Sequence, residues 1–138
     1  VFGDWSSDVC SSDLIRFADL GCYSAESCDY PEFAHAIARA VSTGEYPLGI
    51  TFCGTGQGIS ITANKHQKIR SALCWNTEIA RLAREHNDAN ICAIPGRFVT
   101  DEEAVAIVKT FLSARFEGGR HQRRIDAIPL DCTGGSTS

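Results

Sequence analysis

A cysteine followed by a glycine-rich turn is the part of this sequence best suited to chemistry. The apolar run Ile50-Thr51-Phe52 leads into Cys53, and Gly54-Thr55-Gly56-Gln57-Gly58 follows directly. If the run is a strand and a helix begins after the turn, the thiol and several backbone N–H groups face one small volume that suits an anion. The same field favours the thiolate form of Cys53. A base in this setting is suited to removing a proton next to a carbonyl and holding the resulting enediolate.

Other glycine-rich motifs fit this stretch less well. Gly54, Gly56 and Gly58 form G-x-G-x-G, whereas the dinucleotide-binding fingerprint is G-x-G-x-x-G. A P-loop has Lys and then Ser or Thr after its last glycine, but Ile59-Ser60 follows here. A cysteine phosphatase would need an arginine to close the loop over the phosphate, and this stretch contains none. The remaining alternative is that Cys53 is an inert core thiol beside a tight turn.

Two further groups of residues carry ionisable side chains. His86 stands at the end of an expected helix, just before a strand, where it is either a catalyst or a helix-end cap. Arg120 and Arg124 are four positions apart, so on a helix they share one face and suit a phosphate dianion. The alternative for this pair is a solvated basic turn. The joint presence of thiol, glycine turn, histidine and arginine pair favours the functional interpretation.

Composition indicates one domain of ordinary soluble character. The chain has 138 residues, of which 43% are hydrophobic and 22% charged, which is enough to bury a sizeable core. Its net charge of −4 argues against nucleic acid as a partner, and no apolar run is long enough to cross a membrane. The seven cysteines show no C-x-x-C pair and no zinc-like spacing with histidine. We therefore expect no metal and a reducing, cytoplasmic setting.

The organisation of the chain follows from its hydrophobic periodicity. Short β-type runs alternate with amphipathic helices after residue 15, which is typical of a parallel α/β sheet. Asn76 or Thr77 should cap one helix, and Thr100 with Glu103 should form a capping box at another. Gly44 should stop the first helix. The expected strands are 48–53, 69–75 and 91–94, and the expected helices are 30–43, 59–64, 77–85 and 100–112.

The two ends of the chain differ from this pattern. Residues 1–14 contain a near-repeated Ser-Ser-Asp and show neither helical nor strand periodicity nor the features of a signal peptide. We expect this segment to be non-native, the alternative being an ordinary irregular arm. The folded domain should then occupy 15–132, and 133–138 should be a flexible tail.

Several separated motifs agree in order and spacing with one known family. They are CDYP at 28–31, FCGTGQGIS at 52–60, NK at 64–65, IR at 69–70, HNDAN at 86–90 and GGRHQxR at 118–124. Together they resemble the type B ribose-5-phosphate isomerases, which are grouped with the galactose-6-phosphate and allose-6-phosphate isomerases. The resemblance covers about 21–128, most of the chain.

The resemblance implies a function for each matching residue. Cys53 matches the catalytic base that moves a proton between C1 and C2 of the open-chain sugar, and His86 matches the acid that assists ring opening. Thr55 belongs to the loop that stabilises the enediolate oxygens. The residues that match substrate or phosphate contacts are Tyr30, Gly54, Gly56, Gln57, Gly58, Ser60, Asn87, Arg97, Arg120 and Arg124.

The resemblance also implies a fold, a reaction and a partner. The expected fold is α/β, a three-layer doubly wound (Rossmann-like) parallel sheet of five strands. The expected reaction interconverts ribose 5-phosphate and ribulose 5-phosphate through a cis-enediolate, in the pentose phosphate pathway. The expected partner is a second copy of the chain, in a homodimer whose active sites are shared and need no cofactor. The alternatives are a hexose-6-phosphate isomerase and a non-catalytic sugar-phosphate-binding remnant.

One departure from the family concerns its first strand. That strand ends in Asp-His-x-Gly, which helps to bind the sugar and phosphate, and no such motif is present here. Counting back from Cys53, it would precede Val1. We therefore expect the first strand to be missing or replaced, and the chain to be less stable and inactive for that reason.

Overall fold

Three parallel strands carry the fold of the described part of the chain, which comprises residues 18–20 and 29–130 of the computed structural model. The strands are β1 (Gly49–Cys53), β2 (Ser71–Leu73) and β3 (Ile91–Pro95), and their order in the sheet is β1-β3-β2. β3 is therefore the central one of these three, and all five of its residues are buried. The expectations for 1–14, for a replaced first strand and for the tail 133–138 lie outside the described residues.

Register places equivalent ends of the strands side by side. β1 pairs with β3 from Gly49 opposite Ile91 to Cys53 opposite Pro95, and the whole of β2 pairs with the first three residues of β3. The three expected strands are confirmed, although β2 is shorter than predicted. Its first predicted residues leave the ladder because the Arg70 N–H donates to the Asn90 side chain at 2.8 Å.

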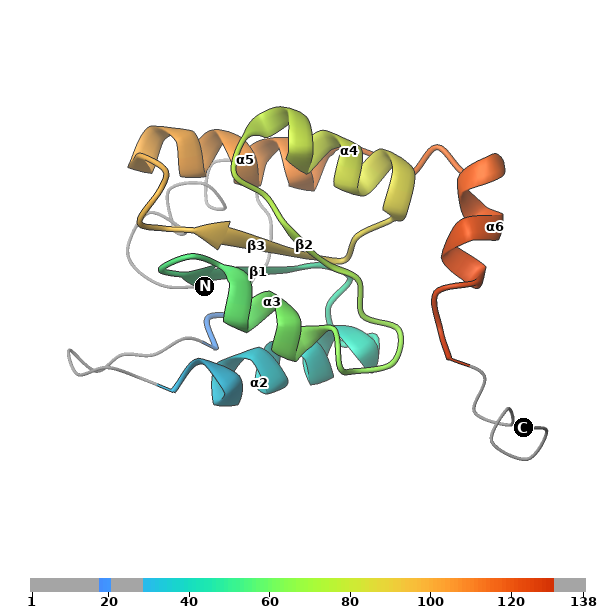
Figure 1. The fold of residues 1–138 in the computed structure, drawn as a ribbon, viewed down its shortest axis with the longest axis horizontal. Helices are drawn as coiled ribbons and strands as arrows, with labels where there is room; N and C mark the ends of the chain where they lie inside the picture. The colour runs from blue at the N-terminus through green and yellow to red at the C-terminus, as the bar shows by residue number, and fades with distance from the viewer. Residues whose placement is uncertain (1–17, 21–28, 131–138) are drawn as a thin grey trace.

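Helices cover both faces of the sheet and make the arrangement three-layered (Figure 1). α2 and α3 pack together on one face, α4 and α5 on the other, and α6 contacts the end of α4. Their bounds are α2 Tyr30–Ser42, α3 Gln57–Ala63, α4 Thr77–Asn87, α5 Asp101–Ser113 and α6 Arg120–Asp126. The predicted α/β class with a doubly wound parallel sheet is confirmed.

The helix boundaries follow the predicted signals at most ends. Asn76 caps α4 by accepting from the Ile79 N–H at 2.8 Å, and Thr100 caps α5 by accepting from the Glu103 N–H at 3.1 Å. α3 begins two residues earlier than predicted because Gly56, with φ of 76°, completes the turn before it. α4 extends to Asn87, beyond the predicted end at Glu85.

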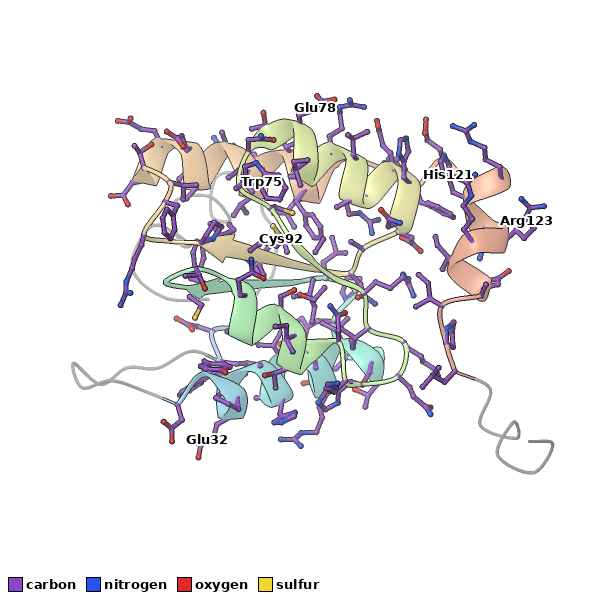
Figure 2. All side chains as sticks on the ribbon, viewed as in Figure 1. Glu32, Trp75, Glu78, Cys92, His121 and Arg123 are labelled. Carbon is purple, nitrogen blue, oxygen red and sulfur yellow. The ribbon has the colours of Figure 1, made fainter. Side chains whose placement is uncertain are left out.

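The core has one apolar layer on each face of the sheet. Between the sheet and the α4/α5 layer, Cys92 of β3 packs in a cluster that includes Ile94, Ile107 and Phe111 (Figure 2). On the other face, Gly49 lets α2 approach closely, since a Cβ atom there would lie 2.9 Å from Ile37 Cγ2. Among the described residues, no helix has both the length and the hydropathy needed to cross a bilayer.

Candidate active site

The loop after β1 is joined to the loop after β3. The Cys53 carbonyl accepts from the Gly96 N–H at 2.8 Å, and the Gly54 carbonyl accepts from the Arg97 N–H at 3.0 Å. Because these strands are adjacent and parallel, their carboxyl ends meet at one edge of the sheet. The half-buried Cys53 is therefore held between two fixed loops. Ligands of open α/β sheets bind at this kind of edge.

Two side chains from distant segments cover the glycines of the Cys53 loop. A Cβ atom on Gly54 would lie 3.0 Å from Arg97 Nε, and one on Gly58 would lie 2.6 Å from Tyr30 Cζ. A side chain at either position would therefore have to displace Arg97 or Tyr30 from the loop. The structure thus brings Tyr30 and Arg97, both expected at the site, to the loop that carries Cys53.

Polar groups of the same loop face solvent. The side chains of Thr55 and Gln57 are exposed, and the Gln57 N–H donates to Thr55 Oγ1 at 3.3 Å. α3 starts at Gln57, and the N–H groups of a first helical turn lack intrahelical acceptors and carry partial positive charge. The loop therefore combines a thiol with donors that can stabilise a negatively charged oxygen.

Ser60, which was also expected at the site, packs against β2. Ser60 is 7% exposed. Its Oγ lies 3.0 Å from Ser71 Oγ and donates to the Ser71 carbonyl at 3.3 Å. These contacts fix α3 to β2 and so position the loop that precedes the helix.

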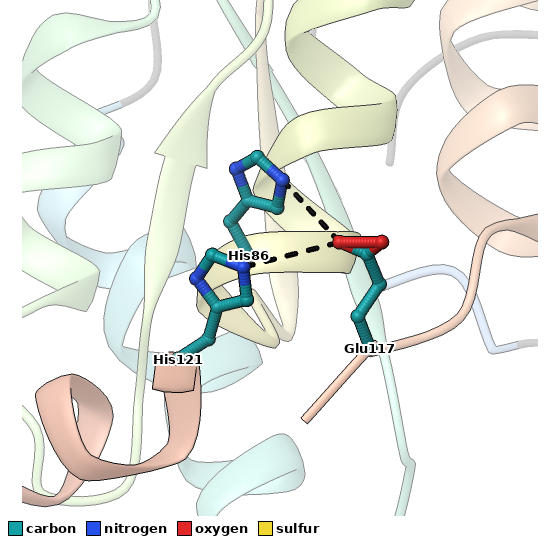
Figure 3. A group of neighbouring side chains, drawn as sticks. All are labelled: His86, Glu117 and His121. Carbon is teal, nitrogen blue, oxygen red and sulfur yellow. Dashed lines mark ion pairs between the residues drawn. The ribbon is translucent and has the colours of Figure 1, made fainter. Parts of the chain in front are cut away.

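A second group of expected residues lies at the end of α4. The rings of His86 and His121 stack at a centroid distance of 4.3 Å and an interplanar angle of 12°. Glu117 Oε1 lies 3.4 Å from His86 Nε2 and 3.9 Å from His121 Nε2 (Figure 3). Desolvation lowers the pKa of His121, with further contributions from His86 and Arg120, so its neutral form is favoured.

The sequence interpretation assigned no function to Glu117 or His121. Their spacing of four residues was the available signal, because it would allow a contact across one helical turn, although Glu117 itself precedes α6. The contact of both with His86 depends on how α6 docks against α4, and sequence spacing does not contain that information.

The basic residues of α6 belong to this second group. Arg120 and Arg124 are both exposed and four positions apart on the helix. Asn87 is the last residue of α4, and its carbonyl accepts from Arg70 Nε at 3.0 Å. His86, Asn87, Arg120 and Arg124 are thus displayed near the junction of α4 and α6.

Within one chain, the two groups lie at opposite edges of the sheet. Cys53 ends β1 beside Pro95, whereas α4 ends just before β3 begins at Ile91. Four residues of strand separate these edges, which is about 13 Å of rise. In Figure 1, α6 and the end of α4 accordingly lie away from the junction of β1 and α3. The expected catalytic pair, Cys53 and His86, is therefore not brought together by a single copy.

Asn64 and Asn90, which belong to the motifs at 64–65 and 86–90, hold neighbouring loops through side-chain hydrogen bonds. Asn64 Nδ2 donates to the Ser71 carbonyl at 2.9 Å, and Asn64 Oδ1 accepts from the Ser71 N–H at 2.7 Å. Asn90 links the Arg70 N–H to the Lys68 carbonyl through its own Oδ1 and Nδ2. These hydrogen bonds fix the amino ends of β2 and β3 and so help to set how the two strands pair.

A three-layer α/β domain with a thiol in a glycine-rich loop and arginines at its edges fits an isomerase acting on a phosphorylated sugar. A family model described as Ribose/Galactose Isomerase matches residues 7–128. The chain belongs to this family.

Named relatives agree over most of their length. The chain is similar to "Ribose-5-phosphate isomerase B" of Escherichia coli (strain K12), with 47% identity over 114 residues, covering 83% of this chain and 76% of that protein. Among solved structures, a ribose-5-phosphate isomerase B of Clostridium thermocellum aligns with a TM-score of 0.87 and 47% identity, covering 90% of this chain and 84% of that one. A Mycoplasma genitalium ribose-5-phosphate isomerase B with bound ribulose-5-phosphate gives 0.85 and 44%, covering 88% and 82%.

Proposed function

We propose that this chain interconverts ribose 5-phosphate and ribulose 5-phosphate through a cis-enediolate, as an aldose–ketose isomerase of the pentose phosphate pathway. The competing outcome is the inactivity expected from the absent Asp-His-x-Gly motif, and an activity assay of this chain with ribose 5-phosphate decides between the two. The relatives named above support the reaction, and one of them holds ribulose-5-phosphate. The Cys53 loop supplies the chemistry, since it carries a thiol and backbone donors, and the guanidinium of Arg97 lies over its Gly54.

The proton transfer is assigned to Cys53. Its thiolate removes the C2 proton of the open-chain aldose, the electron pair forms the C1–C2 double bond, and O1 becomes an enediolate oxygen. The same thiol returns the proton to C1, a proton leaves the C2 hydroxyl for O1, and O2 becomes the carbonyl of the ketose. The Gly54 to Gly58 loop and Thr55 stabilise the developing oxyanion, the part of catalysis for which preorganised donors are most effective.

The other residues bind and prepare the sugar. His86 donates a proton to the ring oxygen and so assists ring opening, with Asn87 beside it as a substrate contact. Arg120 and Arg124 bind the phosphate, because paired guanidinium groups match a phosphate dianion. Tyr30, Gln57 and Arg97 line the sugar at the Cys53 end.

A homodimer with shared active sites is part of the proposal. The observation that supports it is the separation of Cys53 from His86 by the length of β1 within one chain. In a symmetric dimer, the Cys53 edge of one copy can face the His86 edge of the other, which completes two equivalent sites. The partner required is a second copy of this chain.

Complementation between two inactive variants tests this arrangement. Cys53→Ala and His86→Asn are each expected to be inactive alone. After mixing and subunit exchange, a heterodimer has one site with both defects and one intact site, so activity should rise to about one quarter of the wild type. If Cys53 and His86 of the same chain formed each site, mixing would restore nothing.

The cellular compartment is proposed from the cysteines that form no disulfide. Cys53, Cys74 and Cys92 are all free in the structure, and persistent free thiols are typical of a reducing compartment. We therefore place the protein in the cytoplasm.

A further inference from the structure

His86, Glu117 and His121 form the densest cluster of metal-ligating groups in the described part of the chain. One ligand atom from each lies within 4.8 Å of the others. From this geometry we infer that the three side chains form a Zn²⁺ site at the junction of α4 and α6, separate from any requirement of the isomerase reaction.

Atomic spacing carries the inference. Tetrahedral zinc sites place nitrogen and oxygen ligands at about 2.0–2.2 Å from the metal, so two ligand atoms on one ion are about 3.4 Å apart. His86 Nε2 and Glu117 Oε1 are already 3.4 Å apart. His121 Nε2 is 3.9 Å from the same oxygen, and all three ligand atoms lie within 4.8 Å of one another. Each imidazole lone pair lies in its ring plane, so metal binding also requires the partly exposed ring of His86 to turn out of its stack with His121.

Both imidazoles direct the same kind of atom to one carboxylate. Figure 3 shows His86 and His121 stacked side by side, with the Nε2 atom of each turned toward Glu117. Two histidines and one carboxylate are a known donor set for zinc, in which a fourth position stays open to water or substrate. The same set is softer than the all-oxygen sites that Mg²⁺ and Ca²⁺ prefer.

The scaffold holds the three ligands near these positions without a metal. The Glu117 N–H donates to the Glu85 carbonyl at 3.0 Å, which ties the segment before α6 to the last turn of α4. The Glu85 carboxylate in turn accepts from Arg81 at 2.6 Å and 2.9 Å. His121 lies in the first turn of α6 and is only 8% exposed, so its ring has little freedom.

Solvent exposure lets a metal ion reach these ligands, and nearby arginines limit how tightly it binds. The side chains of His86 and Glu117 are 39% and 54% exposed, so an ion can reach them from solvent. Arg120 and Arg124 stand on the same short helix and oppose a cation by charge repulsion. A carboxylate from Glu117 offsets part of that repulsion, which is why we expect its loss to weaken binding strongly.

Occupancy has a consequence that rests on the proposed function. If His86 is the acid that opens the sugar ring, Zn²⁺ on its Nε2 removes the lone pair and proton needed for that step. Zinc should therefore inhibit the isomerase by occupying His86.

Calorimetric titration of the metal-free full chain with Zn²⁺ tests the site directly. We expect one Zn²⁺ per chain, and at least about tenfold weaker binding in both His121→Gln and Glu117→Gln, because each removes a ligand. His66→Gln is the matched control, since it changes the chain's other close histidine pair, in which His35 Nδ1 lies 2.7 Å from His66 Nε2. Glu117→Gln replaces an exposed side chain, so it keeps the test valid if His121→Gln fails to fold.

The outcomes separate this inference from the proposed function. Absence of zinc binding, or equal binding by wild type and Glu117→Gln, would overturn the site whether or not the chain is an isomerase. Weakened binding in Glu117→Gln but not in His66→Gln would establish it even if no isomerase activity were found. In an active preparation, the zinc concentration for half-inhibition should rise at least about tenfold in Glu117→Gln relative to wild type.

Discussion

Gly56 lies so close to Leu73 that a Cβ atom on the glycine would be 2.4 Å from the leucine Cδ1. This contact joins the Cys53 loop to β2, although the two segments are separated by α3. Gly56 also has φ of 76°, a conformation that glycine adopts without strain. The site loop therefore depends on one position for both its turn and its packing.

Gly56→Ala should destabilise the protein by about 2–4 kcal/mol, the sum of left-handed backbone strain and overpacking against Leu73. Gly44→Ala is the matched control, because Gly44 also has positive φ, 84°, but nothing lies within 4 Å of its Cβ position. The control should lose only about 1 kcal/mol. Urea denaturation of both variants measures the difference, and equal losses would show that the contact with Leu73 has no energetic weight.

Much of this fold could be predicted because local signals and packing agree. The apolar run before Cys53, the Asn76 and Thr100 caps and the glycine stop at Gly44 each specify one boundary. The shortening of β2 could not be predicted in the same way. It depends on the Asn90 side chain taking the Arg70 N–H, a contact between residues 20 positions apart.

The candidate site was predicted as a set of residues, but not as an arrangement. Sequence spacing indicated Cys53, His86 and the arginine pair, and the predicted parallel order of β2, α4 and β3 already requires α4 to return His86 to the edge of the sheet opposite Cys53. The contact of Glu117 with His86 was missed, because it arises from the docking of α6 against α4. The docking of one helix against another is a tertiary property that a pattern of residue types does not encode.

Cys53→Ala should reduce isomerisation by at least about 10²–10⁴-fold, the usual contribution of a general base, while leaving substrate binding largely intact. The measurement is deuterium exchange at C2 of ribose 5-phosphate, followed by NMR. Cys74→Ala, which changes a fully buried thiol away from the loop, should retain exchange. Undiminished exchange in Cys53→Ala would remove Cys53 from the mechanism.

Arg124→Ala should weaken binding of ribose 5-phosphate by about 1.5–3 kcal/mol, the contribution of a hydrogen bond to a charged group. Binding of unphosphorylated ribose should change little, because a neutral sugar offers no dianion. Arg123→Ala on the same helix is the matched control, since Arg123 is exposed but does not share the Arg120–Arg124 spacing. Calorimetry with both ligands gives the comparison, and equal losses for the two ligands would assign Arg124 a structural role.

The His35–His66 pair should make stability depend on mild acid. Desolvation lowers the pKa of His66 below its ordinary 6.5, and His35 and Arg39 lower it further. As the pH falls through 6.5 toward the lower folded value, the unfolded state takes up a proton before the folded state does, so the free energy of unfolding decreases.

His66→Gln should therefore flatten the stability profile as the pH falls through 6.5, because the substituted side chain does not titrate. Lys65→Gln, which alters an exposed neighbour outside the pair, should keep the wild-type slope. Urea unfolding at several pH values measures the slopes of all three proteins. If the slope for His66→Gln is as steep as that of the wild type, groups other than His66 must take up the protons that make stability depend on acid.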